Sequence, residues 1–204
     1  MIVETAQRVC ADHCGPAVMR TAEGGTIPEL LWRALADAGF TKALAPVESG
    51  GAGVEFGDAL SLLFPAGRHA VPVPLAETLL AGWLLGEAGL RVPEGPLTVA
   101  PVRDGDALSA SRDGAGWRLQ GQASRVPWAA RCAAIVVLAR CEERNLVALA
   151  APGDCRIAAG SNLAGEPRDE VDFSGVRSTA AAFATPDAAA LHALGALMRS
   201  AQMA

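Results

Sequence analysis

Three residues near the N-terminus have the types and the spacing that could bind a metal ion. Cys10 lies three residues before His13 and four before Cys14, so one helix face could present all three side chains. A structural zinc site takes four such ligands, and the remaining histidines, His69 and His192, stand alone. The five cysteines, an odd number with irregular spacing, favour reduced and mostly buried thiols. The sequence therefore predicts no metal site.

Other chemical motifs are equally incomplete. The glycines at 50, 51 and 53 could turn their amides toward a phosphate, but no Lys-Ser/Thr pair follows them. We interpret them as a turn between helices. Arg125 and Arg131 could meet a pyrophosphate, although solvated arginines at a strand edge are more common. No Gly-x-Ser-x-Gly motif occurs, which argues against a hydrolase.

The composition narrows the class of protein. The chain has 204 residues, 51% of them apolar and 19% charged, which is enough to form a core and is not typical of disorder. A net charge of −5, aromatic residues at 4% and the absence of tyrosine argue against nucleic-acid partners. The longest apolar run, residues 75–90, contains two glutamates and is shorter than the roughly 20 residues of a membrane span. We expect a cytoplasmic protein without a membrane span.

The first ninety residues have helical periodicity. Apolar residues recur every three or four positions in four segments, residues 2–14, 26–39, 58–69 and 74–89. Thr26 and Glu29 have the spacing of a capping box, which would start the second helix, and Gly39 is placed to end that helix. Pro65 is expected to kink or break the third helix, because proline removes one backbone hydrogen bond.

After residue 93 the pattern changes to short strands bounded by Gly, Asp, Pro or Asn. We expect strands at residues 97–102, 116–124, 134–139, 146–150 and 171–173. From residue 187 helical periodicity returns and continues to the last residue without a stop signal. The fold class is α+β. It has an all-helical domain (1–93), a small antiparallel β-barrel or sandwich (94–185), and the first helix of a C-terminal helical bundle that is otherwise missing (186–204).

Several stretches, in their order, carry a resemblance to a known family. They are residues 31–39 with the glycine turn at 44–53, residues 67–80, the hairpin at 113–121, the segments 126–129 and 134–137, and residues 162–169. Together they resemble the N-terminal and middle domains of acyl-CoA dehydrogenases, over nearly the whole chain. The last stretch is similar to a divergent bacterial branch that often supplies one subunit of a two-component enzyme.

The resemblance implies a reaction and its components. Acyl-CoA dehydrogenases bind FAD and desaturate an acyl-CoA thioester between Cα and Cβ, with a carboxylate taking the α-proton and flavin N5 accepting hydride. Their electrons pass to an electron-carrier flavoprotein, in fatty-acid or steroid catabolism. In the family the base usually comes from the C-terminal bundle, which would lie mostly after residue 204. We therefore assign no catalytic base to this chain.

The resemblance also implies five cofactor-binding residues for FAD: Pro101, Val102, Val126, Pro127 and Trp128. The first two stand at the family's Thr-Glu-Pro loop, and the others stand at a strand that normally presents a hydroxyl or amide to the flavin. Pro127 can donate neither kind of hydrogen bond. A local ion pair within the run Glu166-Pro-Arg168 is expected to fix the loop before the last strand.

Three functional hypotheses remain open. The first is the N-terminal and middle portion of an FAD-dependent acyl-CoA dehydrogenase that is inactive without its base domain. The second is a catalytically silent subunit that completes or stabilises the FAD site of a partner dehydrogenase in a homo- or hetero-oligomer. The third is a helix-plus-barrel module that binds acyl-CoA without redox chemistry. Proline at position 127 favours the second hypothesis.

Overall fold

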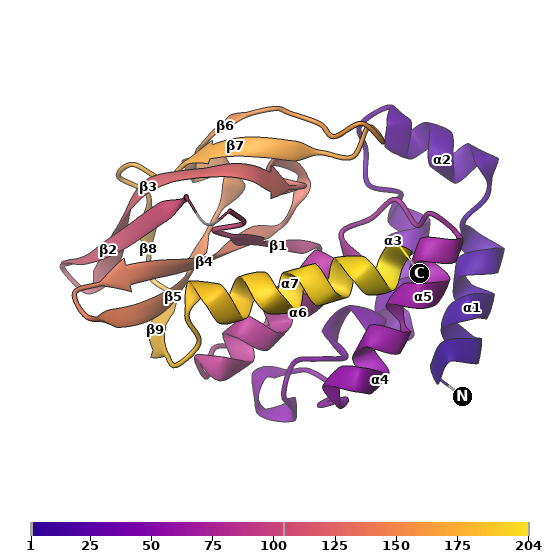
Figure 1. The fold of residues 1–204 in the computed structure, drawn as a ribbon, viewed down its shortest axis with the longest axis horizontal. Helices are drawn as coiled ribbons and strands as arrows, with labels where there is room; N and C mark the ends of the chain where they lie inside the picture. The colour runs from indigo at the N-terminus through magenta and orange to yellow at the C-terminus, as the bar shows by residue number, and fades with distance from the viewer. Residues whose placement is uncertain (1, 104, 204) are drawn as a thin grey trace.

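The computed structural model describes residues 2–103 and 105–203. Figure 1 shows helices α1–α5 gathered at one end and a strongly twisted sheet at the other, with α6 and α7 crossing between them. The helical part contains α1 (Ile2–His13), α2 (Pro16–Glu23), α3 (Glu29–Asp37), α4 (Phe56–Ser61), α5 (Leu63–Arg68) and α6 (Leu75–Glu87), with short 3₁₀ turns at Phe40–Lys42 and Val47–Ser49. The α+β fold class is confirmed.

The ends of these helices differ in part from the sequence-based expectations. Helix α3 begins after Pro28, and no side-chain hydrogen bond caps it, so the capping box expected at Thr26 is wrong. Gly39 ends α3 with a φ of 77°, in the left-handed region that favours glycine. The break expected at Pro65 lies at Leu62 instead. Pro65 falls in the first turn of α5, where a missing N–H costs little.

The strands form one nine-stranded sheet. They are β1 (Leu97–Ala100), β2 (Ala107–Asp113), β3 (Gly116–Pro127), β4 (Ala134–Cys141), β5 (Arg144–Ala150), β6 (Arg156–Ala158), β7 (Arg168–Asp172), β8 (Arg177–Ser178) and β9 (Ala181–Ala184). The order is β6-β7-β3-β2-β4-β5-β9, with β1 paired to β4 and β8 paired to β3. The sheet is mixed rather than wholly antiparallel, because β1 runs parallel to β4 with Leu97 opposite Ala134.

Two buried clusters hold the chain together. One lies inside the sheet around Leu119, Val126 and Phe173. The other joins the helices to one face of the sheet. Helix α6 is central to the second cluster, because nine of its thirteen residues are buried. Such a helix is enclosed on several sides, as its nearly continuous apolar sequence predicts.

Thr78 links α6 to the first strand. Its side chain is 1% exposed. Its Oγ1 lies 2.6 Å from the Pro74 carbonyl oxygen, to which it can donate, and accepts the backbone N–H of Leu97 at 3.0 Å. The hydroxyl therefore satisfies the first amide of β1 and fixes the strand against the helix.

Replacing Thr78 with valine keeps the shape of the side chain and removes this acceptor. We expect the free energy of unfolding to fall by about 1–3 kcal/mol, because the Leu97 N–H is then left buried without a partner. Urea denaturation measures the change, and Thr78→Ser, which keeps the hydroxyl, is the matched control. A valine variant as stable as the original chain would contradict the role assigned to the hydroxyl.

Helix α7 (Ala188–Met203) lies across the helical part and packs on α5 and α6. Asp187 caps its first turn, because its Oδ1 accepts the N–H of Ala190 at 2.8 Å. Leu191, Met198 and Ala201 form the buried stripe of the helix. None of the helices formed by residues 2–103 and 105–203 combines the length and apolar character needed to cross a membrane.

Candidate functional site

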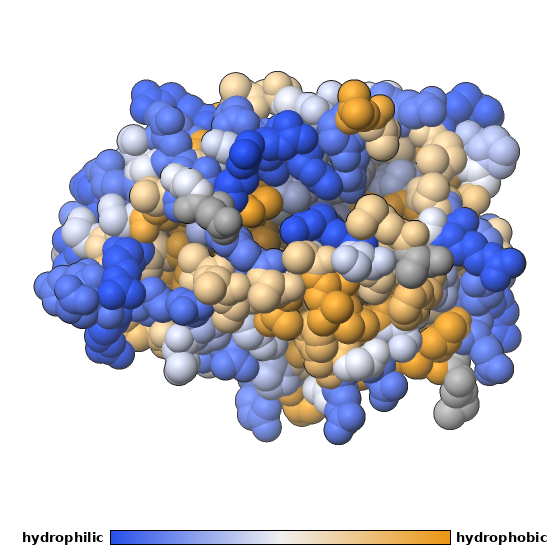
Figure 2. Space-filling model, in the orientation of Figure 1, coloured by the Kyte–Doolittle hydropathy of each residue, from blue (hydrophilic) through white to orange (hydrophobic). Residues whose placement is uncertain are grey.

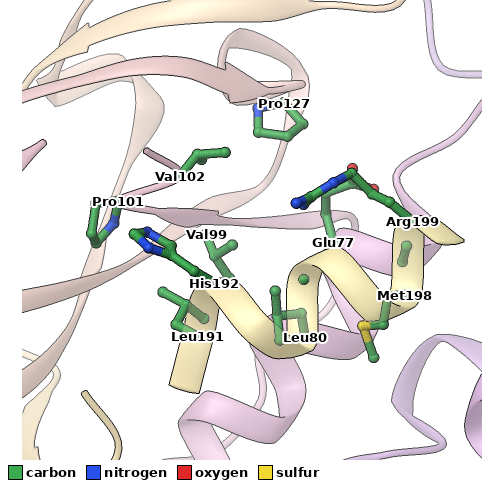
Figure 3. A pocket seen from close by; sticks show the side chains of 12 residues that line it. Glu77, Leu80, Val99, Pro101, Val102, Pro127, Leu191, His192, Met198 and Arg199 are labelled. Atoms are coloured by element: carbon green, nitrogen blue, oxygen red, sulfur yellow. The ribbon is translucent and has the colours of Figure 1, made fainter. Parts of the chain in front are cut away.

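A pocket lies where α6, β1, the end of β3 and α7 meet (Figure 3). Its walls are formed by Ala76, Glu77, Leu80, Val99, Pro101, Val102, Pro127, Leu191, His192, Gly195, Met198 and Arg199. The space between them is about 30 Å³, enough for about two water molecules. Figure 2 shows a hollow in the surface between the sheet and α7 on this face of the molecule. Most of the wall is apolar, so its few polar side chains stand out.

Glu77 is the acidic group of this pocket. It lies in the first turn of α6 and is half-buried. Burial, with repulsion from Glu166, raises the pKa of its carboxyl to about 7, although a hydrogen bond from its own backbone N–H and the charges of Arg168 and Arg199 partly oppose this shift. An acid with a pKa near 7 is present in both protonation states at neutral pH, so it can donate or accept a hydrogen bond.

His192 and Arg199 reach the pocket from α7. They lie seven residues apart, which is two helical turns, and so they project from the same face of the helix. Figure 3 shows the His192 ring directed toward Pro101 and the Arg199 side chain extending toward Glu77. The sequence alone predicted no role for Glu77, His192 or Arg199. A signal was present, because Glu77 interrupts a long apolar run and His192 shares a helical face with Arg199.

The structure brings three of the five predicted cofactor-binding residues together. Pro101, Val102 and Pro127 line the pocket. Val126 is fully buried in the sheet core. Trp128 is 3% exposed and lines a different groove, beside α2 and the loop at residues 164–167. The role of all five in binding a cofactor stays a prediction.

These positions offer few donors for the polar edge of a flavin ring. Pro101 and Pro127 have no backbone N–H. The Val102 N–H points to Asp106 Oδ2 at 3.4 Å, and the Arg125 N–H donates to Glu170 Oε1 at 3.2 Å. Within the described residues the Trp128 indole N–H has no acceptor, but it is sealed inside the protein. The residues at the predicted positions therefore do not fit a flavin ring held by this chain alone.

The loop before β7 lines the neighbouring groove that contains Trp128, and hydrogen bonds hold it firmly. Arg168 pairs with Glu166 at 2.6 Å, which confirms the predicted ion pair. Asn162 Oδ1 accepts the N–H groups of Ala164 and Glu166 at 3.0 and 2.9 Å. The buried Asp169 carboxylate accepts the Ala130 N–H at 3.0 Å and so ties β7 to the turn after β3. Arg168 is therefore occupied on its own loop.

Metal chemistry has no support from side-chain placement. Across residues 2–103 and 105–203, no three His, Cys, Asp or Glu side chains converge as metal ligands. Cys10 and Cys14 are free thiols, and burial raises the pKa of both. The polar side chains of the pocket offer hydrogen bonding at Glu77, His192 and Arg199 and proton transfer at Glu77.

Comparison with known proteins identifies relatives of the helical part. Residues 1–90 match the family model described as acyl-CoA dehydrogenase, N-terminal domain. Acyl-CoA dehydrogenase IpdE2 of Mycobacterium tuberculosis is 40% identical over 84 residues, which are 40% of this chain and 26% of that protein. The protein of the same name from Mycolicibacterium smegmatis is 36% identical over 97 residues, 46% of this chain and 31% of that protein.

Solved structures extend the likeness to the rest of the chain. The Tcur3481-Tcur3483 steroid ACAD G363A variant has a TM-score of 0.78 at 27% identity, covering 98% of this chain and 60% of that chain. The ChsE4-ChsE5 complex from Mycobacterium tuberculosis has a TM-score of 0.78 at 23% identity, covering 98% and 61%. A glutaryl-CoA dehydrogenase from Mycobacterium smegmatis in complex with FADH2 has a TM-score of 0.70 at 14% identity, covering 98% and 59%. This chain thus spans about 60% of the solved chains it matches.

Proposed function

We propose that this chain is a member of the acyl-CoA dehydrogenase family and works as one subunit of a hetero-oligomeric acyl-CoA dehydrogenase. Residues 1–90 match the N-terminal domain of that family, and the described residues have the fold of the similar steroid ACAD structure. The assembled enzyme is an oxidoreductase that desaturates an acyl-CoA thioester between Cα and Cβ and passes electrons to a carrier flavoprotein. Two of the similar structures are named as pairs of different proteins, Tcur3481-Tcur3483 and ChsE4-ChsE5.

The observation that carries this proposal is the lack of donors at the predicted flavin positions. FAD is the cofactor that the family implies, and a ring with several polar edge atoms needs matching hydrogen bonds. Because Pro101 and Pro127 supply none, we assign the flavin mainly to the partner subunit. This chain contributes a wall of the substrate pocket, in which Leu80, Val99 and Met198 exclude water.

We also infer the substrate class and the compartment. A similar structure at 27% identity is named a steroid ACAD, which favours a steroid-derived acyl group over a simple fatty acyl chain. All five cysteines are free thiols, which supports the reducing environment of the cytoplasm. A complete dehydrogenase that holds its own FAD is the alternative, and it makes a different prediction for the isolated protein.

Flavin content separates these functions. We expect the full-length protein to be colourless when purified alone and to yield a yellow complex when co-expressed with a second acyl-CoA dehydrogenase from the same organism. Addition of an acyl-CoA under anaerobic conditions should bleach the flavin absorbance of that complex. A yellow protein that bleaches without a partner would show that this chain holds FAD itself. Failure of every flavin-loaded complex to bleach with steroid-derived or linear acyl thioesters would overturn the dehydrogenase proposal.

A further inference from the structure

Two arginine side chains lie over aromatic rings at one end of the sheet. The Cζ atom of Arg112 is 4.1 Å from the centroid of the Trp117 ring, and that of Arg144 is 3.7 Å from the centroid of the Phe183 ring. The two rings contact each other edge to face, with centroids 5.5 Å apart and planes at 87°. The four residues therefore form one continuous row, Arg112, Trp117, Phe183 and Arg144, which we call the arginine–aromatic row.

The pairing of the strands positions this row. Arg112 on β2 lies opposite Trp117 on β3. Phe183 on β9 lies opposite Leu146, which follows Arg144 by two residues on β5. Both rings pack on the buried cluster inside the sheet, so the core fixes them, whereas Arg112 and Arg144 are exposed. Two rigidly held rings therefore support two cations at the surface.

The two stacked guanidinium groups have no anionic partner. In the part of the chain that the structure describes, neither the Arg112 nor the Arg144 side chain makes a hydrogen bond or an ion pair. Stacking on a ring uses the face of a guanidinium and leaves the N–H groups along its edge available. An arginine that is already held in place also loses less side-chain entropy when it binds a carboxylate. Both side chains are therefore preorganised to bind anions.

The surroundings of the row carry an excess of positive charge. Asp113 is already bound by two arginines, Arg118 at 2.7 Å and Arg177 at 2.9 Å, and Glu143 pairs with Arg140 at 3.3 Å. The turns and strand ends beside the row carry five arginines and three carboxylates, namely Arg112, Arg118, Arg140, Arg144, Arg177, Asp113, Glu142 and Glu143. Figure 2 shows hydrophilic residues over the end of the molecule where the β2–β3 and β4–β5 turns lie. A positive surface on a chain of net charge −5 favours an acidic partner.

The kind of anion follows from the two separate rings. A phosphate site gathers several donors around one point, whereas these two guanidinium groups lie over different rings. Two cations on neighbouring rings match two carboxylates carried by one chain, and arginine and tryptophan often dominate the binding energy of protein interfaces. We propose that the arginine–aromatic row is a docking surface for a partner protein that presents an acidic segment, with Arg112 and Arg144 each binding one carboxylate. This surface is separate from the pocket, and the proposal does not depend on the dehydrogenase function.

The test uses the full-length protein labelled with 5-fluorotryptophan and a peptide of Glu-Gly repeats as the probe. The ¹⁹F NMR signal of Trp117 is identified by its loss in Trp117→Phe. We expect the peptide to shift this signal in a saturable way, and the affinity to fall as salt is raised from about 50 to about 300 mM. Arg112→Gln and Arg144→Gln should each weaken binding about threefold and the double variant about tenfold, because an exposed ion pair contributes modestly.

Matched variants separate docking from folding and from charge alone. Arg20→Gln removes an exposed arginine from α2, at the other end of the molecule, and should leave the affinity unchanged. Lysine at both positions, Arg112→Lys with Arg144→Lys, keeps the charges but not the planar guanidinium groups, so it should weaken binding nearly as much as glutamine. Thermal unfolding checks that each variant is folded, and a peptide of Gln-Gly repeats should cause no shift.

The proposal is overturned if the acidic peptide leaves the Trp117 signal unchanged, or if the double glutamine or double lysine variant binds it as tightly as the original chain. In that case the two arginines only shield the rings from water or bind by charge alone. Tighter binding of inorganic phosphate than of the peptide, at equal ionic strength, would also overturn it, because the surface would then be a phosphate site.

Discussion

Replacing Gly67 with alanine is expected to loosen the end of α7 and to lower the free energy of unfolding by about 1–3 kcal/mol, the usual cost of overpacking. Gly67 lies in α5, where α7 crosses it. A Cβ atom at this position would lie 1.7 Å from the carbonyl oxygen of Gln202, which is backbone and cannot turn aside. The helix end must therefore move, and Arg199, one turn earlier on α7, moves with it.

Gly57 provides the matched control for this variant. It lies in α4, and a Cβ atom there would meet nothing within 4 Å. Gly57→Ala should therefore be neutral or stabilise the helix by about 0.5–1 kcal/mol, because alanine loses less backbone entropy. Thermal and urea unfolding of the two variants measures the difference. Equal stability would mean that α7 does not pack against α5 in solution, and the pocket as described here would be wrong.

The sequence predicted those features of the fold that depend only on neighbouring residues. Gly39 ends a helix in the left-handed conformation, and the ion pair of Glu166 with Arg168 forms as expected. The capping box at Thr26 failed because Pro28 takes the position before the first helical turn. The break expected at Pro65 is wrong for a related reason, because proline is tolerated in the first turn of a helix. The break between α4 and α5 lies at Leu62 instead.

The sheet shows what a single sequence cannot specify. Strand β2 alternates buried and exposed residues, but its small residues, such as Ala107 and Ser109, have little strand propensity of their own. It forms because its backbone pairs with β3. Whether β1 runs parallel or antiparallel to β4 likewise depends on the path of the chain between them. A residue pattern of period two is the same in both cases.

The candidate site also contains residues that the sequence predicted and residues that it missed. The resemblance assigned five residues to one cofactor site, and the structure brings three of them, Pro101, Val102 and Pro127, into one pocket. Glu77 and Arg199 were missed because they come from α6 and α7, which are far apart in the sequence and meet only after folding. Val126 shows the converse, because a position matched by the resemblance is fully buried in the sheet core.

Glu77 should also give the protein a distinctive dependence of stability on pH. Its pKa is raised from 4.5 to about 7 by folding, mainly through burial. Between these pH values the folded chain holds a proton that the unfolded chain has released. The free energy of unfolding therefore falls as pH rises. The contribution of Glu77 is therefore fully present below pH 4.5 and is lost as pH rises through about 7, by up to about 3 kcal/mol.

Glu77→Gln isolates this contribution, because glutamine stays neutral throughout the range. Urea unfolding at half-unit intervals from pH 4.5 to 8 should show the original chain losing stability relative to Glu77→Gln as pH rises. Other titrating groups, such as Asp172, are common to both proteins and cancel in the difference. Glu87→Gln, at an exposed site on the same helix, controls for the loss of a carboxylate. Parallel curves for the original chain and Glu77→Gln would mean that the Glu77 carboxyl is solvated, and they would contradict the burial that raises its pKa.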